Sequence, residues 1–133
     1  KILNKIFTNE YDFKDYDRAT NIYWPGNKLG HGREDVFKLW NSLKNILSEI
    51  KFKIEHVGYL DEPNKNPRAS IRWSLEGVHS EDSKDYGKKT NSHLNIIGIN
   101  HAELNQYGVI KEWVLFDEVA IWKQILMNKS KNG

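Results

Sequence analysis

The first third of the chain places apolar side chains three and four residues apart, which is the spacing of one helix face. We therefore predict helical structure up to about Asn21, in two short pieces. The Tyr-Trp pair at 23–24 is a brief extended segment that the following Pro-Gly pair stops, and residues 29–32 predict a loop. A longer helix begins at Arg33, and one stripe of apolar side chains defines it: Val36, Phe37, Trp40, Leu43, Ile46, Leu47 and Ile50.

After this helix the period changes to two, which predicts strands. We expect strands at residues 52–57, 69–79, 93–104 and 109–116. Residues 105–108 form a hairpin turn with a glycine available for positive φ, and residues 119–126 form a last amphipathic helix. Helices followed by long antiparallel strands predict an α+β domain with the helices on one sheet face.

A length of 133 residues fits one domain over 1–133. We expect about 1–50 to be mainly helical, 51–117 mainly sheet, 118–128 a C-terminal helix and 129–133 a tail. Because the first residue is Lys1 rather than Met, we expect the natural chain to begin earlier.

The composition excludes several classes of function. The chain has no cysteine, so it has no disulfide, zinc–thiolate site or cysteine nucleophile, and this suits a reducing cytoplasm. The formal net charge of +2 is scattered, which argues against a nucleic-acid partner. No apolar run approaches the roughly 20 residues that cross a bilayer. No phosphate loop or nucleotide fingerprint is present, so we expect no cofactor and no membrane partner.

The second half of the chain carries three recognisable motifs. Residues 70–79 read Ser-Ile-Arg-Trp-Ser-Leu-Glu-Gly-Val-His, residues 97–101 read Ile-Gly-Ile-Asn-His, and residues 108–118 read Gly-Val-Ile-Lys-Glu-Trp-Val-Leu-Phe-Asp-Glu. In this order they resemble successive strands of the SnoaL-like polyketide cyclase family, within the ketosteroid-isomerase-like superfamily. The resemblance covers roughly residues 30–126, including a short last helix with Gln124.

This resemblance implies a conical, strongly curved antiparallel sheet whose concave face holds the N-terminal helices around a pocket. Superfamily members include polyketide cyclases, steroid isomerases and epoxide hydrolases, so the fold alone does not define a reaction. The partner it implies is a hydrophobic small molecule. Members commonly dimerise through the outer sheet face, and we expect a homodimer that buries roughly 800 Å² per partner or more.

The resemblance also implies a catalytic carboxylate near the end of the last strand, where Asp117 stands. Alternation puts Trp113 and Asp117 on one face and Glu112 on the other, and both faces are fairly apolar. We therefore expect Asp117 and Trp113 to face the cavity, and Glu112 to face solvent or a partner. Two interpretations of Asp117 are open: a general base whose pKa burial raises, or a cap of the following helix.

Two histidines and three aromatic residues complete the candidate site. His101 is expected to assist Asp117, and His79 to contact the ligand; the alternative for each is a hydrogen-bonded structural histidine. Trp73 is expected on the cavity face of its strand. Tyr23 and Trp24 are expected at the pocket mouth, with core packing as the alternative.

A metal site is rejected on spacing. His93 and His101 stand eight residues apart on one strand, so their Cα atoms are roughly 26 Å apart and cannot share an ion. Three hypotheses for the function stay open. The chain is an acid–base enzyme acting on a hydrophobic carbonyl compound, a non-catalytic ligand-binding module, or a dimeric interaction domain.

Overall fold

The computed structural model describes residues 16–132, the last five of them by their backbone alone. Eight elements follow one another along this part of the chain: β1 (Tyr16–Trp24), β2 (Lys28–His31), α2 (Arg33–Lys44), β3 (Leu47–Leu60), β4 (Arg68–His79), β5 (His93–Asn105), β6 (Gly108–Phe116) and α3 (Glu118–Asn132).

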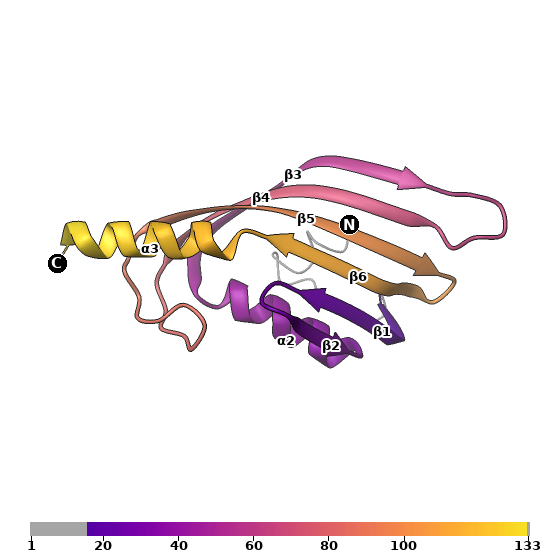
Figure 1. Ribbon diagram of the computed structural model, residues 1–133, viewed down its shortest axis with the longest axis horizontal. Coiled ribbons are helices and arrows are strands. Elements are labelled where there is room, and N and C mark those ends of the chain that lie inside the picture. The colour runs from indigo at the N-terminus through magenta and orange to yellow at the C-terminus, as the bar shows by residue number, and fades with distance from the viewer. Residues whose placement is uncertain (1–15, 133) are drawn as a thin grey trace.

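All six strands form one curved sheet in the order β2-β1-β6-β5-β4-β3 (Figure 1). Neighbouring strands are antiparallel except β1 and β6, which run parallel, so the sheet is mixed. We call the face on which α2 packs the inner face and the opposite one the outer face. In Figure 1, β1 and β2 pass in front of α2, so the view is onto the outer face.

Aromatic side chains fill the space between α2 and the inner face. The Trp40 ring from α2 meets the rings of Trp24 and Trp73 at centroid distances of 4.8 and 6.0 Å. A glycine makes this packing possible, because a Cβ on Gly98 would lie 2.1 Å from the Trp73 ring. The core therefore requires a strand position without a side chain directly beneath the indole.

The N-terminal third differs from the sequence prediction. Helical structure up to Asn21 is wrong from Tyr16 onward, where β1 begins, and the predicted helix before it lies outside the described residues. Residues 29–31, expected within a loop, belong to the strand β2. The long helix is shorter than predicted, since α2 ends at Lys44 and the last apolar residues of its stripe belong to the turn and to β3.

The C-terminal half agrees with the prediction. The strands at 69–79, 93–104 and 109–116 and the hairpin between the last two are confirmed, each within a residue or so. The last helix is longer than predicted, and Gln124 ties it to the sheet through both backbone groups of Asn95, at 2.8 and 2.9 Å. Neither helix in the described part of the chain has the length and apolar character that crossing a membrane requires.

Candidate functional site

A carboxylate is buried in the inner face of β6. Glu112 is only 4% exposed, and its two oxygens accept hydrogen bonds from the Tyr16 hydroxyl at 3.1 and 3.2 Å. The Trp40 indole N–H donates a further bond at 3.3 Å. Three elements meet here, because Tyr16 opens β1, Trp40 lies on α2 and Glu112 lies on β6. The expectation that Glu112 lies on a solvated face is therefore wrong.

Burial raises the pKa of the Glu112 carboxyl to about 7, because the ionised form loses its hydration. The hydrogen bonds from Tyr16 and Trp40 and a weaker interaction with the Asn100 amide oppose this shift, since they favour the charged form. The group therefore exchanges a proton near neutral pH, which is the range in which a general acid or base works best.

A second polar side chain, Asn100, is buried beside this carboxylate. It lies on β5 one diagonal step from Glu112, since Asn100 pairs with Val114 and Glu112 pairs with Ala102. Its Oδ1 accepts a hydrogen bond of 2.8 Å from the Trp73 indole N–H. Its Nδ2 is buried and has no hydrogen-bond partner within the described residues.

The inner face beside Glu112 carries small and apolar side chains. Ala102 on β5 pairs with Glu112, and Ala69 on β4 pairs with Ala102. In this row of the sheet, the two side chains next to Glu112 are therefore small. Beside this row, Ile71 and Leu104 are only partly buried and pack against the core. A polar proton-exchanging group next to small and half-buried apolar side chains is the composition expected of a small-molecule site.

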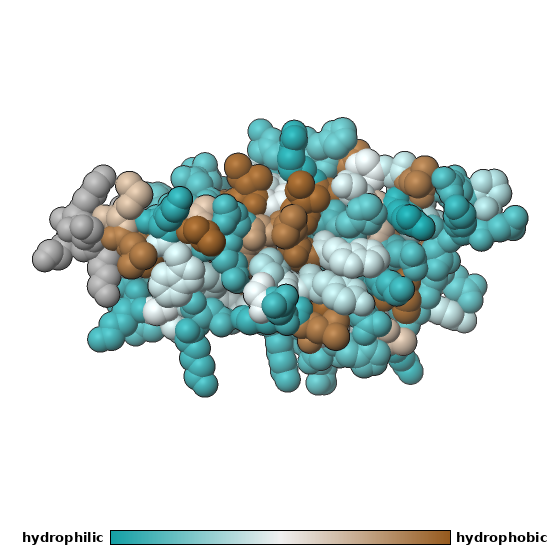
Figure 2. Space-filling view, in the orientation of Figure 1, coloured by the Kyte–Doolittle hydropathy of each residue, from teal (hydrophilic) through white to brown (hydrophobic). Residues whose placement is uncertain are grey.

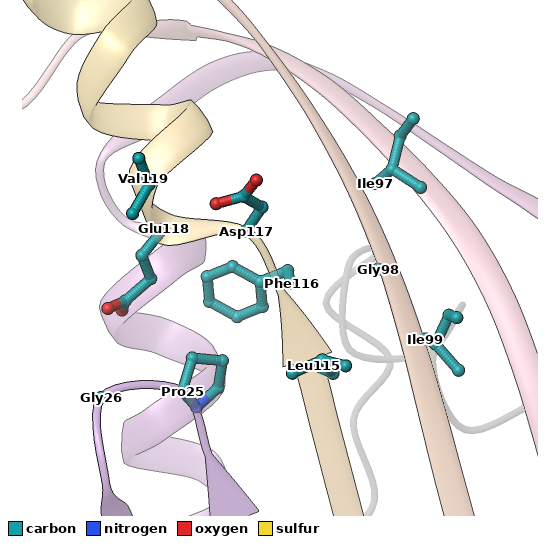
Figure 3. Close-up of a pocket in the computed structure, with 10 residues that line it drawn as sticks. All are labelled: Pro25, Gly26, Ile97, Gly98, Ile99, Leu115, Phe116, Asp117, Glu118 and Val119. Carbon is teal, nitrogen blue, oxygen red and sulfur yellow. The ribbon is translucent and has the colours of Figure 1, made fainter.

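Asp117 lies on the outer face, just after β6. Its Oδ1 accepts a hydrogen bond of 3.1 Å from the Ala120 N–H, so it caps α3, and its side chain is exposed. It also lines an apolar pocket of about 570 Å³ on this face. Figure 3 shows Asp117 between β6 and α3, with Ile97 and Ile99 projecting from β5. The cap is thus observed, whereas the expected position in the inner cavity is wrong.

Three other predicted site residues share this outer face. The ring of Trp113 stacks on Tyr23 at 5.7 Å and meets His101 edge-on at 5.9 Å. Because alternate residues of a strand point to opposite faces, none of these rings reaches the Glu112 side of the sheet. The expectation that Trp113 and Trp73 face one cavity is wrong, since Trp73 is fully buried on the inner face.

The remaining predicted residues lie in the core. Trp24 is buried against Trp40 and Phe116, and His79 is fully buried, with Nδ1 3.1 Å from the Thr90 hydroxyl. Burial lowers the pKa of the His79 imidazole, an effect that Asp82 opposes. His79 stands nine residues beyond Ser70 along β4, at the far end of the sheet from Glu112.

The outer face exposes a continuous group of large apolar side chains on β1, β5, β6 and the start of α3. Ile97 is 68% exposed and Leu115 is 67% exposed. Figure 2 shows hydrophobic side chains gathered in the middle of this face, with hydrophilic ones around them. The exposed apolar residues of this outer patch are Tyr23, Ile97, Ile99, Trp113, Leu115 and Val119.

The sequence contained a signal for which residues of β5 and β6 lie on the inner face. A bulky indole at Trp73 needs a small neighbour, and Gly98 is the residue of β5 that supplies it. That pairing places Gly98 and Asn100 on the inner face and His101 on the outer one. The hairpin register then carries the assignment to β6 and turns Glu112 inward.

The architecture is thus that of a curved α+β cone with a polar group buried beneath its helix. No protein-family model matches the sequence, and no curated protein is significantly similar to it. Solved structures share the fold and so confirm the SnoaL-like resemblance at that level.

Two of these structures are proposed polyketide cyclases. The protein from Xanthomonas campestris pv. campestris has a TM-score of 0.73 at 6% identity, over 92% of this chain and 89% of that one. The SnoaL-like protein from Jannaschia sp. CCS1 has a TM-score of 0.69 at 13% identity, over 84% of this chain and 73% of that one. AclR, a proposed hydroxylase from Streptomyces galilaeus, has a TM-score of 0.72 at 8% identity, over 95% of this chain and 90% of that one.

Proposed function

We propose that this protein binds a small, largely apolar carbonyl compound on the inner face of its sheet and moves a proton on that compound with Glu112. The observation that carries the proposal is the buried Glu112 carboxyl, held by Tyr16 and Trp40 with its pKa raised to about 7. Similarity in fold to proposed polyketide cyclases supports chemistry of this class.

The proposed step needs only the carboxyl group and the bound ligand. Ionised Glu112 takes a proton from the carbon next to the carbonyl, and the electron pair of that C–H bond moves toward the carbonyl oxygen. The carboxylic acid so formed returns the proton to the same or another position of the ligand. Isomerisation and ring closure both begin with such a proton transfer, and the side chains next to the carboxyl in its row of the sheet, Ala102 and Ala69, are small.

Hydrogen exchange at the carbon next to a carbonyl tests this proposal. Wild-type protein, incubated in D₂O with aromatic methyl ketones such as 2-acetylnaphthalene, should speed deuterium incorporation, which NMR measures. Glu112→Gln should lower that rate by about 10²- to 10⁴-fold, as is typical for losing a general base. Asp117→Asn makes the same chemical change on the outer face and should leave the rate unchanged.

The two variants also separate the hypotheses. If Asp117→Asn loses the exchange activity and Glu112→Gln retains it, then Asp117 is the general base and the proposal is refuted. Ketone binding without any accelerated exchange would support a non-catalytic binding module instead.

A second proposal concerns assembly. We propose that the outer patch is covered by a second copy of this chain, in a homodimer. Single chains rarely expose large contiguous apolar patches, and four residues of this one, Ile97, Ile99, Leu115 and Val119, line the pocket of about 570 Å³. The SnoaL-like resemblance supports the choice of partner, because it implies a homodimer through the outer sheet face. Arg72 and Glu76 lie beside the patch on β4, where both are exposed.

Sedimentation of the wild type at tens of micromolar tests assembly. A dimer is expected, and Leu115→Glu should convert it to monomer because the charge would be buried in the interface. Lys53→Glu changes an exposed residue of the edge strand β3 and should leave the dimer intact. A wild-type monomer throughout would refute the homodimer.

A further inference from the structure

The orientation of one buried amide is fixed by its neighbour. An indole N–H can only donate, so the Asn100 atom 2.8 Å from Trp73 Nε1 must be the amide oxygen. Trp73 is itself held, because it is fully buried and packs against Trp40 and Phe116. The Asn100 Nδ2 group is thereby directed away from Trp73.

The directed Nδ2 group is a donor without an acceptor. Asn100 is 1% exposed, and its Nδ2 makes no hydrogen bond within the described part of the chain. It faces Glu112 and favours the ionised form of that carboxyl, although the two groups do not meet the geometry of a full hydrogen bond. Burying an unpaired amide donor destabilises the folded state, so its retention needs an explanation.

Two other buried polar atoms lack partners within the described residues, and they differ from this one. Thr20 Oγ1 belongs to a hydroxyl that can rotate to a new partner. His79 Nε2 lies at the other end of β4, far from the carboxyl. Only Asn100 has an orientation fixed by another side chain and lies diagonally beside Glu112.

We infer that Asn100 Nδ2 and Glu112 together bind one oxygen atom of the ligand, and that this oxygen is a carbonyl oxygen. An oxygen between them accepts a hydrogen bond from Nδ2 and, when Glu112 is protonated, a second from the carboxylic acid. While ionised Glu112 takes the proton from carbon, Nδ2 stabilises the negative charge that develops on this oxygen, and the carboxylic acid so formed then donates the second hydrogen bond to it. The inference rests on the proposed function and adds to it the ligand group that is recognised.

This arrangement selects among ligands of similar shape. A hydrocarbon would leave Nδ2 unpaired, and an ammonium group would place a second donor against it. A site built to pair a polar ligand group discriminates strongly against an analogue that lacks the group. Ketones and related carbonyl compounds therefore fit this site better than hydrocarbons or amines.

Paired ligands test the inference without any need for turnover. Equilibrium dialysis with 2-acetylnaphthalene and with 2-ethylnaphthalene gives the ratio of the two affinities in each protein. Asn100→Asp keeps the acceptor for Trp73 but removes the amide donor, so this ratio should shift about tenfold toward the hydrocarbon. Asn95→Asp makes the same change on the outer face of the same strand and should leave the ratio as in the wild type.

A second measurement avoids substitution at the site. In ¹⁵N-labelled wild type, the ketone should shift the Asn100 side-chain amide protons downfield, and the hydrocarbon should not. An unchanged ratio in Asn100→Asp, equal shifts with both ligands, or no binding of the ketone would overturn the inference. Deuterium exchange is a separate measurement. If the protein prefers the ketone but does not accelerate exchange, the proposed catalytic function is refuted and the inference about carbonyl recognition is not.

Discussion

Two carboxylates only five residues apart, Glu112 and Asp117, stand on opposite faces of the sheet and have opposite surroundings. Glu112 is enclosed by the Tyr16 hydroxyl and the Trp40 indole, and burial raises its pKa to about 7. Asp117 is exposed and accepts a backbone N–H at the start of α3. Environment, and not residue type or nearness in sequence, separates a proton-exchanging group from a structural cap.

The two faces of β6 also show why apolar content alone does not identify a core. Val114 and Phe116 are buried on the inner face, whereas Trp113 and Leu115 are exposed on the outer one. Both faces are apolar because, on our proposal, each packs against something: the inner face against α2, the outer against a second chain.

The largest effect is expected from disturbing the inner face. Gly98→Ala would bring a methyl group to 2.1 Å from the Trp73 ring, and a fully buried indole cannot move away. We expect a loss of about 3 kcal/mol or more in the free energy of unfolding, measured with urea. Gly58→Ala is the control, since its Cβ would meet nothing closer than 3.9 Å. Equal losses in both variants would contradict the packing described for Trp73.

A comparable effect, dependent on pH, is expected at Glu112. Its pKa is about 7 in the folded state and near the ordinary value of 4.5 when unfolded, so the folded state holds the proton more tightly. Stability from this group is present below about pH 4.5 and is lost as pH rises to 7, by about 3 kcal/mol in total. Glu112→Gln cannot titrate, so its stability relative to the wild type should rise over this range.

Urea unfolding at several pH values measures that difference. Asp117→Asn serves as the comparison, because it makes the same chemical change at an exposed position on the outer face. A constant difference for Glu112→Gln would mean that the buried carboxyl has an ordinary pKa.

A smaller effect is expected at the helix cap. Asp117→Ala removes the acceptor for the Ala120 N–H and should cost about 1 kcal/mol of stability, whereas Asp117→Asn, itself a good cap, should cost much less. Thermal or urea unfolding measures both variants. If Asn is as costly as Ala, the charge rather than the cap is what the helix requires.

The sequence predicts the C-terminal half of the fold better than the N-terminal part. The strands β4, β5 and β6 alternate regularly, and the hairpin turn at 105–108 fixes how the last two pair. In β1 the alternation is broken, because its register on β6 shifts between Tyr16 and Asn21. The remaining spacing of Phe13, Tyr16 and Ala19 imitates a helix, so this strand was not predictable from periodicity.

The candidate site was only partly predictable for a related reason. Trp73 was placed on the correct face because the strand that carries it has one polar and one apolar side. On β6 both sides are apolar, and a charged residue such as Glu112 is ordinarily expected outside. The donors that hold it, Tyr16 and Trp40, lie far away in sequence, so only the folded chain brings them together.

The parallel pairing of β1 with β6 has a consequence for the order in which the chain folds. The bond between Tyr16 and Glu112 spans 96 residues, and β1 has no partner on that side until β6 has been synthesised. Contacts of such long range slow folding, because the intervening loop must close first. During translation, β1 therefore waits with an unsatisfied strand edge, and Glu112 becomes buried only after β6 has left the ribosome.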